Sequence, residues 1–264
     1  MTTALLPAAF DALAAVATLA LATWLVSVVR RDASLADRMW PAFIAAAAIV
    51  CWRSLPTSAL RRDVMLALAL VWALRLGVYI TWRNWGHGED RRYQAIRARN
   101  EPGFAYKSLY LVFALQGLLA WFVAAPFLVG MAGTRPFGAA DAIGAAICAF
   151  GIAFEAIGDA QMARFKANTG HRREVLDRGL WRYTRHPNYF GEACVWWGLA
   201  LMALSAAGAG GAWCLVSPLL MTLLLLKVSG VSLLEKDIGE RRPAYRDYVQ
   251  RTPAFFPDRP RPRP

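Results

Sequence analysis

The sequence has few of the residues from which metal sites and disulfides are built. Only three histidines and four cysteines occur among its 264 residues. The cysteines Cys51, Cys148, Cys194 and Cys214 lie in or beside apolar runs, and none has a cysteine or histidine partner at metal-ligand spacing. We therefore expect them to be small core residues, and we expect neither a metal site nor a disulfide.

Several signs of soluble or repeated architecture are also missing. The chain has no Gly-x-Gly-x-x-Gly loop, which excludes the dinucleotide-binding turn of a Rossmann fold. It shows no internal repeat, no heptad run and no appended soluble domain. Its first 29 residues contain no Lys or Arg, so they lack the basic start of a cleaved signal peptide. We predict a single membrane domain over residues 1–264.

Apolar residues make up 57% of the chain and gather into long blocks. A transmembrane helix needs roughly 20 such residues to cross about 30 Å of hydrocarbon, so we predict an all-α integral membrane bundle of about seven transmembrane helices. The expected spans are Ala8–Val29, Trp40–Trp52, Val64–Trp82, Leu109–Gly130, Ala139–Ala160, Gly191–Ala206 and Trp213–Leu234. The second is short, and a re-entrant or interfacial segment is its alternative interpretation.

Lys and Arg gather on alternate connections. The first, third and fifth connections and the C-terminal tail carry most of the 30 cationic residues, whereas the sixth connection has none. Because cationic loops resist translocation, we expect these segments in the cytoplasm and the N-terminus outside. We expect the cell's inner (plasma) membrane, with the site on its cytoplasmic side. Topology accounts for most of the net charge of +12, so we expect no nucleic-acid partner.

Polar residues of the third connection and the fifth span have spacings that suggest shared faces. Glu89, Tyr93 and Arg97 are four residues apart, as are Glu155 and Asp159, so each set lies on one side of a helix. An acid or phenol at the bilayer edge can donate a proton, and ionisable groups at membrane depth usually face a protein-lined cavity. A solvated helix held by salt bridges and a carboxylate pair neutralised by arginines remain the structural alternatives.

Two further segments combine charge with aromatic and turn residues. The string Arg185-His-Pro-Asn-Tyr-Phe-Gly-Glu192 joins phosphate donors, a proline-fixed turn and a helix start, whose positive potential favours anions. After the seventh span, Arg241, Tyr245 and Tyr248 can close over a nucleotide by charge and stacking. A juxtamembrane basic turn and aromatic anchoring are the alternatives.

These segments resemble a known family. The sequences that carry the resemblance are Trp72-Ala-Leu-Arg-Leu, Gly88-Glu-Asp-Arg-Arg-Tyr, Leu115-Gln-Gly, the Arg185–Glu192 string, Arg242-Pro-Ala-Tyr and Thr252-Pro-Ala-Phe-Phe-Pro. Together they resemble the steroid 5-alpha-reductase superfamily, most closely its bacterial branch, DUF1295. The resemblance implies a seven-helix bundle that binds NADPH in a cytosolic-side cavity and passes hydride to a conjugated double bond of a steroid or other lipid enone.

The resemblance also implies particular cofactor contacts within about residues 155–257. The residues that resemble nicotinamide-nucleotide contacts are Asp159, Lys166, Asn188 and Glu192, with Lys166 standing where the steroid enzymes have Arg. Further candidates in the same region are Arg185, His186, Tyr189, Glu235, Arg241 and Tyr245. The implied substrate is a hydrophobic small molecule or lipid, and we expect a monomer or weak oligomer in contact with membrane lipid.

The chain differs from the steroid enzymes at the positions of their catalytic Glu and Tyr. Their Gln-Glu-Leu-Pro segment is represented by Arg53-Ser-Leu-Pro, and Trp72 stands at the position of their catalytic Tyr. Steroid reduction itself is therefore in doubt. We take Tyr93 and Glu89 of the third connection as the candidate catalytic residues.

Two other classes of function remain alternatives. Membrane methyltransferases that use S-adenosylmethionine, such as isoprenylcysteine carboxyl methyltransferase, also have an Arg-His-Pro-x-Tyr-x-Gly string. They usually have fewer spans and a Glu-Glu pair where this chain has Glu235-Lys236, and they lack the Gly88–Tyr93 segment. A transporter or structural membrane protein is the non-enzymatic alternative, but inverted repeats and broken helices are not evident.

Overall fold

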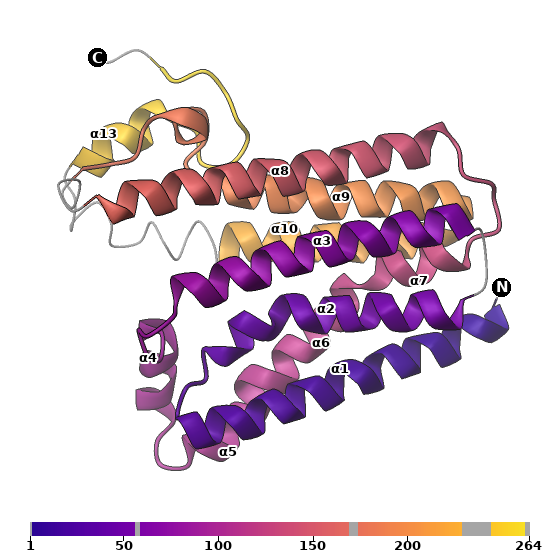
Figure 1. Cartoon of the computed structure of the whole chain (residues 1–264), viewed down its shortest axis with the longest axis horizontal. Coiled ribbons are helices and arrows are strands. Elements are labelled where there is room, and N and C mark those ends of the chain that lie inside the picture. Colours follow the sequence, from indigo (N-terminus) through magenta and orange to yellow (C-terminus); the bar gives the residue numbers. More distant parts are fainter. Residues whose placement is uncertain (1, 56–58, 169–173, 229–243, 262–264) are drawn as a thin grey trace. The chain divides into compact units, whose positions relative to one another are not determined.

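The computed structural model describes residues 2–55, 59–168, 174–228 and 244–261 (Figure 1). Within these ranges the chain forms helices and connections, and no strand. The helices are α1 (Thr2–Arg30), α2 (Leu35–Ser54), α3 (Ala59–Arg83), α4 (Arg91–Asn100), α5 (Phe104–Ser108), η1 (Leu109–Ala114), α6 (Leu115–Val123), α7 (Ala125–Ala132), α8 (Ala139–Ala167), η3 (Gly179–Arg182), α9 (Pro187–Ala207), η4 (Gly208–Leu215), α10 (Val216–Leu223), η5 (Leu224–Val228) and α13 (Ala244–Arg251).

Six stretches of the described residues are long and apolar enough to cross a membrane. They are Ala4–Arg30, Leu35–Ser54, Leu60–Arg83, Phe104–Ala132, Ala139–Ala167 and Pro187–Lys227. Helices suit the hydrocarbon interior of a membrane because their backbone N–H and C=O groups hydrogen-bond to one another within the helix. The sequence prediction of an all-helical membrane protein is confirmed, whereas seven crossings and the side of each terminus stay predictions.

The second of these stretches is longer than its apolar run. α2 has 20 residues, because the charged Asp37 and Arg38 belong to its first turns. Arg38 is partly neutralised by Asp32, whose Oδ2 lies 3.4 Å from Arg38 Nη2. A helix of about 20 residues reaches the usual spanning length, so the short-segment interpretation of this region is not required.

The fourth and sixth stretches are not single regular helices. Phe104–Ala132 contains the π-helix η1, and Pro126 lies in the first turn of α7, where its missing N–H costs no intrahelical hydrogen bond. Pro187–Lys227 is 41 residues long and is interrupted by η4, which begins at Gly208 with φ of 63°. Trp197 Nε1 donates to Thr222 Oγ1 at 3.4 Å, so the chain reverses direction between them.

Contacts between Cα atoms group the chain into two compact units, which we treat separately. Unit 1 comprises Met1–Ala142 and Ala200–Ser217, and unit 2 comprises Ile143–Leu199 and Pro218–Pro264. In unit 1, α1 packs along α2, α2 packs along α3, and α6 contacts both α1 and α2. Whether the chain acts as a single domain, as the sequence predicts, stays a prediction.

A fully buried ion pair ties together four segments of unit 1. Arg61 Nε donates to Asp141 Oδ1 at 2.6 Å, and neither side chain is exposed. Arg61 also donates to the carbonyls of Arg135 and Pro136, at 2.8 and 2.9 Å. Ser205 Oγ donates to Asp141 Oδ2 at 2.8 Å. Most donors and acceptors of the pair are hydrogen-bonded, and these bonds offset the free energy needed to remove the two charges from water. The pair therefore connects α3, the start of α8 and the end of α9.

Glycines bring α8 and α9 into close contact in unit 2. A Cβ added at Gly151 would lie 2.5 Å from Gly191 O, and one added at Gly191 would lie 2.7 Å from Gly151 O. About two turns after Gly191 in α9, a Cβ added at Gly198 would lie 2.5 Å from Gly144 O of α8. Small residues let membrane helices approach at backbone distance, where packing replaces the missing hydrophobic effect. This contact fixes which side chains of the two helices meet.

The Arg61–Asp141 pair gives a direct stability prediction. Arg61→Ala is expected to cost about 3 to 5 kcal/mol of unfolding free energy, because Asp141 would keep a buried charge without its partner. The neighbouring Arg62 is the matched control: its nearest carboxylate is the half-exposed Asp63 at 3.8 Å, so Arg62→Ala is expected to cost less than about 1 kcal/mol. Denaturant unfolding in detergent, followed by circular dichroism, measures both. Equal small losses would show that the pair is not a structural tie.

Candidate functional site

Polar side chains form a cluster in each unit, and each cluster contains residues that the sequence marks as candidates. In unit 1 the Tyr93 cluster consists of Asp37, Arg92, Tyr93 and Gln116. In unit 2 the Asp159 cluster consists of Glu155, Asp159, Asn188 and Glu192.

The Tyr93 cluster joins three helices through one phenol. Asp90 caps α4 by accepting from Arg92 N at 2.9 Å, which sets Tyr93 in the first turn. Tyr93 OH donates to Asp37 Oδ1 of α2 at 2.5 Å and accepts from Gln116 Nε2 of α6 at 2.8 Å. Arg92 Nη2 donates to Asp37 Oδ2 at 2.8 Å. Gln116 Oε1 is buried, and no donor among the described residues reaches it.

The surroundings of Tyr93 keep its phenol protonated. Its side chain is buried, and burial raises its pKa. The negative charge and the acceptor role of Asp37 raise the pKa further, whereas Arg92 and the Gln116 amide lower it by less. Tyr93 is therefore a neutral hydroxyl that carries a proton throughout the physiological pH range.

Glu89 has the contacts of an anchoring carboxylate. Arg97 donates to both of its oxygens, at 2.9 and 2.8 Å, and Ala33 N donates to Oε1 at 2.8 Å. Burial alone would raise the pKa of Glu89, but the Arg97 and Ala33 hydrogen bonds and the Arg97 charge lower it overall. An ionised carboxylate holds no proton to donate. Of the two catalytic candidates, the contacts favour Tyr93 over Glu89.

The Asp159 cluster forms where the C-terminal part of α8 meets the start of α9. Glu155, Asp159 and Glu192 are all buried, with 2%, 5% and 6% of their surface exposed. Asn188 Nδ2 donates to Asp159 Oδ1 at 3.5 Å, and Trp196 Nε1 donates to Glu192 Oε1 at 2.8 Å. Asn188 Oδ1 is buried without a donor among the described residues. An unmet buried acceptor costs about 1 to 3 kcal/mol, so it requires a physical explanation.

Local sequence explains why these side chains meet. Pro187 begins α9, a position where its fixed φ is favourable. Asn188 and Glu192 are four residues apart, so they share a face of that helix. Gly191, between them, has no Cβ, which would otherwise lie 2.7 Å from Glu155 Cγ. The Asn-x-x-Gly-Glu spacing therefore presents an amide and a carboxylate to the acidic end of α8.

The residues before α9 hold the C-terminal segment in place. Arg185 Nη1 donates to the carbonyls of Val249 and Thr252, at 3.2 and 2.5 Å. Thr184 Oγ1 donates to Phe255 O at 2.9 Å, and Tyr248 OH donates to Trp181 O. Arg185, expected from the sequence to meet phosphate, thus has contacts that position α13 and the chain after it.

The other predicted cofactor residues lie in different surroundings. His186 is buried and stacks on Tyr189, with ring centroids 5.2 Å apart and planes 3° from parallel. Tyr245 packs against Tyr248 edge to face, with centroids 5.5 Å apart. Lys166 is exposed near the end of α8. Glu235 and Arg241 lie outside the described residues, as does the end of the predicted seventh span.

Sequence reasoning missed Asp37, the residue that holds the Tyr93 hydroxyl. It lies 56 residues from Tyr93 in the chain, and the cationic pattern of the first connection does not indicate it. The signal present is an acid in the first turn of a helix, where the helix dipole favours negative charge. Gln116, by contrast, belongs to the Leu115-Gln-Gly sequence that carries the family resemblance.

The described helices and the polar clusters at their ends define an all-helical integral membrane protein. Residues 23–252 match the family described as "Protein of unknown function (DUF1295)", and the chain belongs to this steroid 5-alpha-reductase-like group. An uncharacterized protein of Schizosaccharomyces pombe is 27% identical over 262 residues, which cover 89% of this chain and 75% of that protein. No solved structure matches the chain.

The role of Glu89 can be tested by pH. The pKa of Glu89 in the folded protein lies below the ordinary value of 4.5. At pH values above 4.5, the wild-type protein should therefore have a larger unfolding free energy than Glu89→Gln. The advantage should shrink as the pH falls below it, since the folded carboxylate then takes up its proton. Denaturant unfolding of both proteins between pH 3 and pH 8 measures the difference. A change confined to pH 5–7 would indicate a raised pKa and would restore Glu89 as the candidate acid.

Proposed function

We propose that this protein is an NADPH-dependent membrane oxidoreductase that reduces a carbon–carbon double bond of a lipid enone, steroid-like or of another shape. The likeness of the DUF1295 family to the steroid 5-alpha-reductases supports this proposal. The observation that carries the proposal is the Asp159 cluster, in which Asn188 presents a buried amide oxygen without a donor among the described residues.

The groups of the Asp159 cluster fit the nicotinamide riboside half of such a cofactor. A nicotinamide carboxamide offers two N–H donors and one acceptor, and ribose hydroxyls both donate and accept. The carboxylate form of Asp159 or Glu192 only accepts hydrogen bonds, whereas Asn188 supplies a donor and an acceptor. A ligand N–H or O–H would satisfy Asn188 Oδ1, which removes the cost of burying it.

The same carboxylates do not suit a pyrophosphate, which requires cations. Lys166 is exposed near the end of α8, and its ammonium can reach a phosphate from there. Arg241 is the further phosphate candidate from the sequence. Arg185 is engaged with backbone carbonyls of the C-terminal segment, so we assign it a positioning role.

Reduction of the double bond also requires a proton. Bound NADPH supplies a hydride to one carbon, and the protein must deliver one proton to the other for the charges to balance. Tyr93 is our candidate donor, because its buried phenol is protonated and rotation of its hydroxyl away from Asp37 frees the proton. A phenol of raised pKa gives its proton only to a strongly basic site, such as the enolate that hydride addition creates.

Trp72 and the Arg53-Ser-Leu-Pro segment stand at the positions of the steroid enzymes' catalytic residues, and they support a substrate that is bound differently from a steroid. Trp72 is fully buried, with 1% of its surface exposed, and has no ionisable group to offer. Arg53 is exposed at the end of α2. We therefore propose a lipid enone that is not held by the carbonyl contact of the steroid enzymes.

We further propose seven membrane crossings with the N-terminus outside and the C-terminus in the cytoplasm. The reversal of the chain within Pro187–Lys227 supports two crossings there, since 41 helical residues would extend about 60 Å, twice the hydrocarbon thickness. The cationic connections support a cytoplasmic position for the connections that hold Tyr93 and Asn188. The membrane is then the plasma membrane.

Nucleotide binding tests the proposal. NADPH at about 100 times its dissociation constant is expected to raise the unfolding free energy of the detergent-purified protein by about 2.7 kcal/mol. Asn188→Ala should weaken NADPH roughly tenfold, because an amide donor and acceptor are lost. Asn100→Ala is the matched control: its amide donates to Ile96 O in unit 1, and NADPH affinity should not change.

The same thermal and denaturant assay includes NADH and S-adenosylmethionine as separate ligands. NADH is expected to bind more weakly, because it lacks the phosphate that exposed cations recognise. Stabilisation by S-adenosylmethionine alone would reject the reductase and favour the methyltransferase. Equal loss of NADPH affinity in Asn188→Ala and Asn100→Ala would remove the Asp159 cluster from the proposal.

A further inference from the structure

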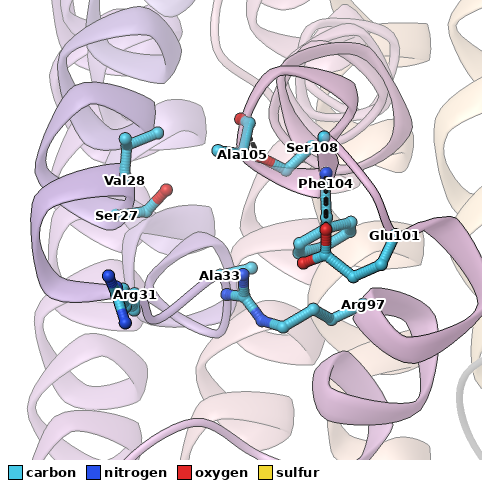
Figure 2. A pocket seen from close by; sticks show the side chains of 10 residues that line it. Ser27, Val28, Arg31, Ala33, Arg97, Glu101, Phe104, Ala105 and Ser108 are labelled. Carbon is cyan, nitrogen blue, oxygen red and sulfur yellow. Dashed lines mark hydrogen bonds between the residues drawn. The ribbon is translucent and has the colours of Figure 1, made fainter.

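Unit 1 contains a cavity at the ends of two candidate membrane spans. It has a volume of about 490 Å³, within the usual range of small-molecule sites, and Tyr93 is not among the residues that line it. Ser27, Val28 and Arg31 form the wall at the end of α1, and Glu101, Phe104 and Ser108 lie on the α5 side (Figure 2). Because Ala4–Arg30 ends and Phe104–Ala132 begins here, the cavity lies where lipid headgroups meet the hydrocarbon.

The charged side chains around the cavity differ in whether an oppositely charged side chain pairs with them. Arg97 is held by both oxygens of Glu89, and its guanidinium also lies 4.6 Å from the centre of the Phe104 ring. Arg31 is exposed, and no carboxylate among the described residues pairs with it. Glu101 is also exposed, and its negative charge helps to raise the pKa of the nearby Arg97 guanidinium. Its carboxylate accepts a long contact of 3.5 Å from Phe104 N. One cation and one carboxylate are therefore available to a ligand.

The backbone at Arg31 is unusual for an arginine. Its φ is 52°, the left-handed conformation that usually follows a helix as Gly or Asn. Asp32 N donates to Ser27 O at 3.0 Å, which closes this helix end. A non-glycine residue in this conformation costs about 1 to 2 kcal/mol, so stability alone favours Gly here. Strain of this kind commonly accompanies a functional side chain.

We propose that this cavity binds the headgroup of a zwitterionic phospholipid that carries a phosphate and a primary ammonium, as in phosphatidylethanolamine. The phosphate pairs with Arg31, and the ammonium donates to Glu101. The hydroxyls of Ser27 and Ser108 line the same space. Each donates to a backbone carbonyl, Trp24 O and Ala105 O respectively, both at 2.8 Å, so their oxygens are left as acceptors for the ammonium. The acyl chains continue along the apolar surface of the spans.

The same contacts select against the other common headgroups. A quaternary choline has no N–H to donate to Glu101, and Arg97 already lies over the Phe104 face that a choline would use. An anionic glycerol headgroup leaves Glu101 unpaired beside a negative phosphate. The inference does not depend on the proposed reductase activity, because none of the residues of either polar cluster takes part in it.

The measurement is native mass spectrometry of the full chain in detergent with phosphatidylethanolamine, phosphatidylcholine or phosphatidylglycerol added. We expect phosphatidylethanolamine to be retained most strongly at a single site. Arg31→Gly should weaken this site roughly tenfold, because a charge-assisted hydrogen bond is lost, while denaturant unfolding shows unchanged or higher stability. Arg30→Ala removes a neighbouring charge that does not line the cavity, and retention should be unchanged.

Glu101→Gln separates recognition of the ammonium from recognition of the phosphate. It should leave phosphatidylethanolamine and phosphatidylglycerol bound about equally. The proposal is overturned if wild type does not discriminate among the three lipids, or if Arg31→Gly and Arg30→Ala behave alike. Soluble glycerophosphoethanolamine and inorganic phosphate are run as competitors. Strong binding of either, with no retention of the lipid, would identify a soluble ligand and also overturn it.

Discussion

Every polar group buried in a bilayer-spanning chain must find its partner within the protein, and this requirement organises the structure. Hydrocarbon offers no water to an unsatisfied donor or acceptor, so each costs several kcal/mol. The Arg61–Asp141 pair meets the requirement most completely, since both side chains are wholly buried and share further bonds with backbone carbonyls and Ser205. The Tyr93 hydroxyl meets it by bonding Asp37 and Gln116.

The Asp159 cluster departs from this rule in a way that suggests chemistry. Glycine contacts between α8 and α9 bring Gly191 against Glu155, so the acidic end of one helix meets the amide-bearing start of the other. Arg185 and Thr184 donate hydrogen bonds to the C-terminal segment. Real proteins tolerate imperfect satisfaction mainly at sites that bind something, and Asn188 Oδ1 is such an atom.

The sequence predicted the helical membrane class and the positions of most spans, because long apolar runs depend only on local composition. It misjudged the start of α2, where Asp37 and Arg38 are polar but helical. Tyr93 could be proposed from helical spacing, whereas its partner Asp37 and the Arg61–Asp141 pair could not, since they join residues 56 and 80 positions apart. Such pairs depend on tertiary packing. Glu89 is bonded to Arg97 and Ala33, and Arg185 is bonded to the C-terminal segment, so their part in a site stays a prediction.

We propose that the polar groups at the α8–α9 contact bind a nicotinamide nucleotide. Backbone hydrogen exchange, measured by mass spectrometry on the detergent-purified protein with and without NADPH, can test this binding. We expect slower exchange within residues 155–168 and 185–196 when NADPH is present, because the ligand covers α8 and the start of α9. Unchanged exchange in these segments, with slowing confined to residues 27–37 and 91–108, would contradict it.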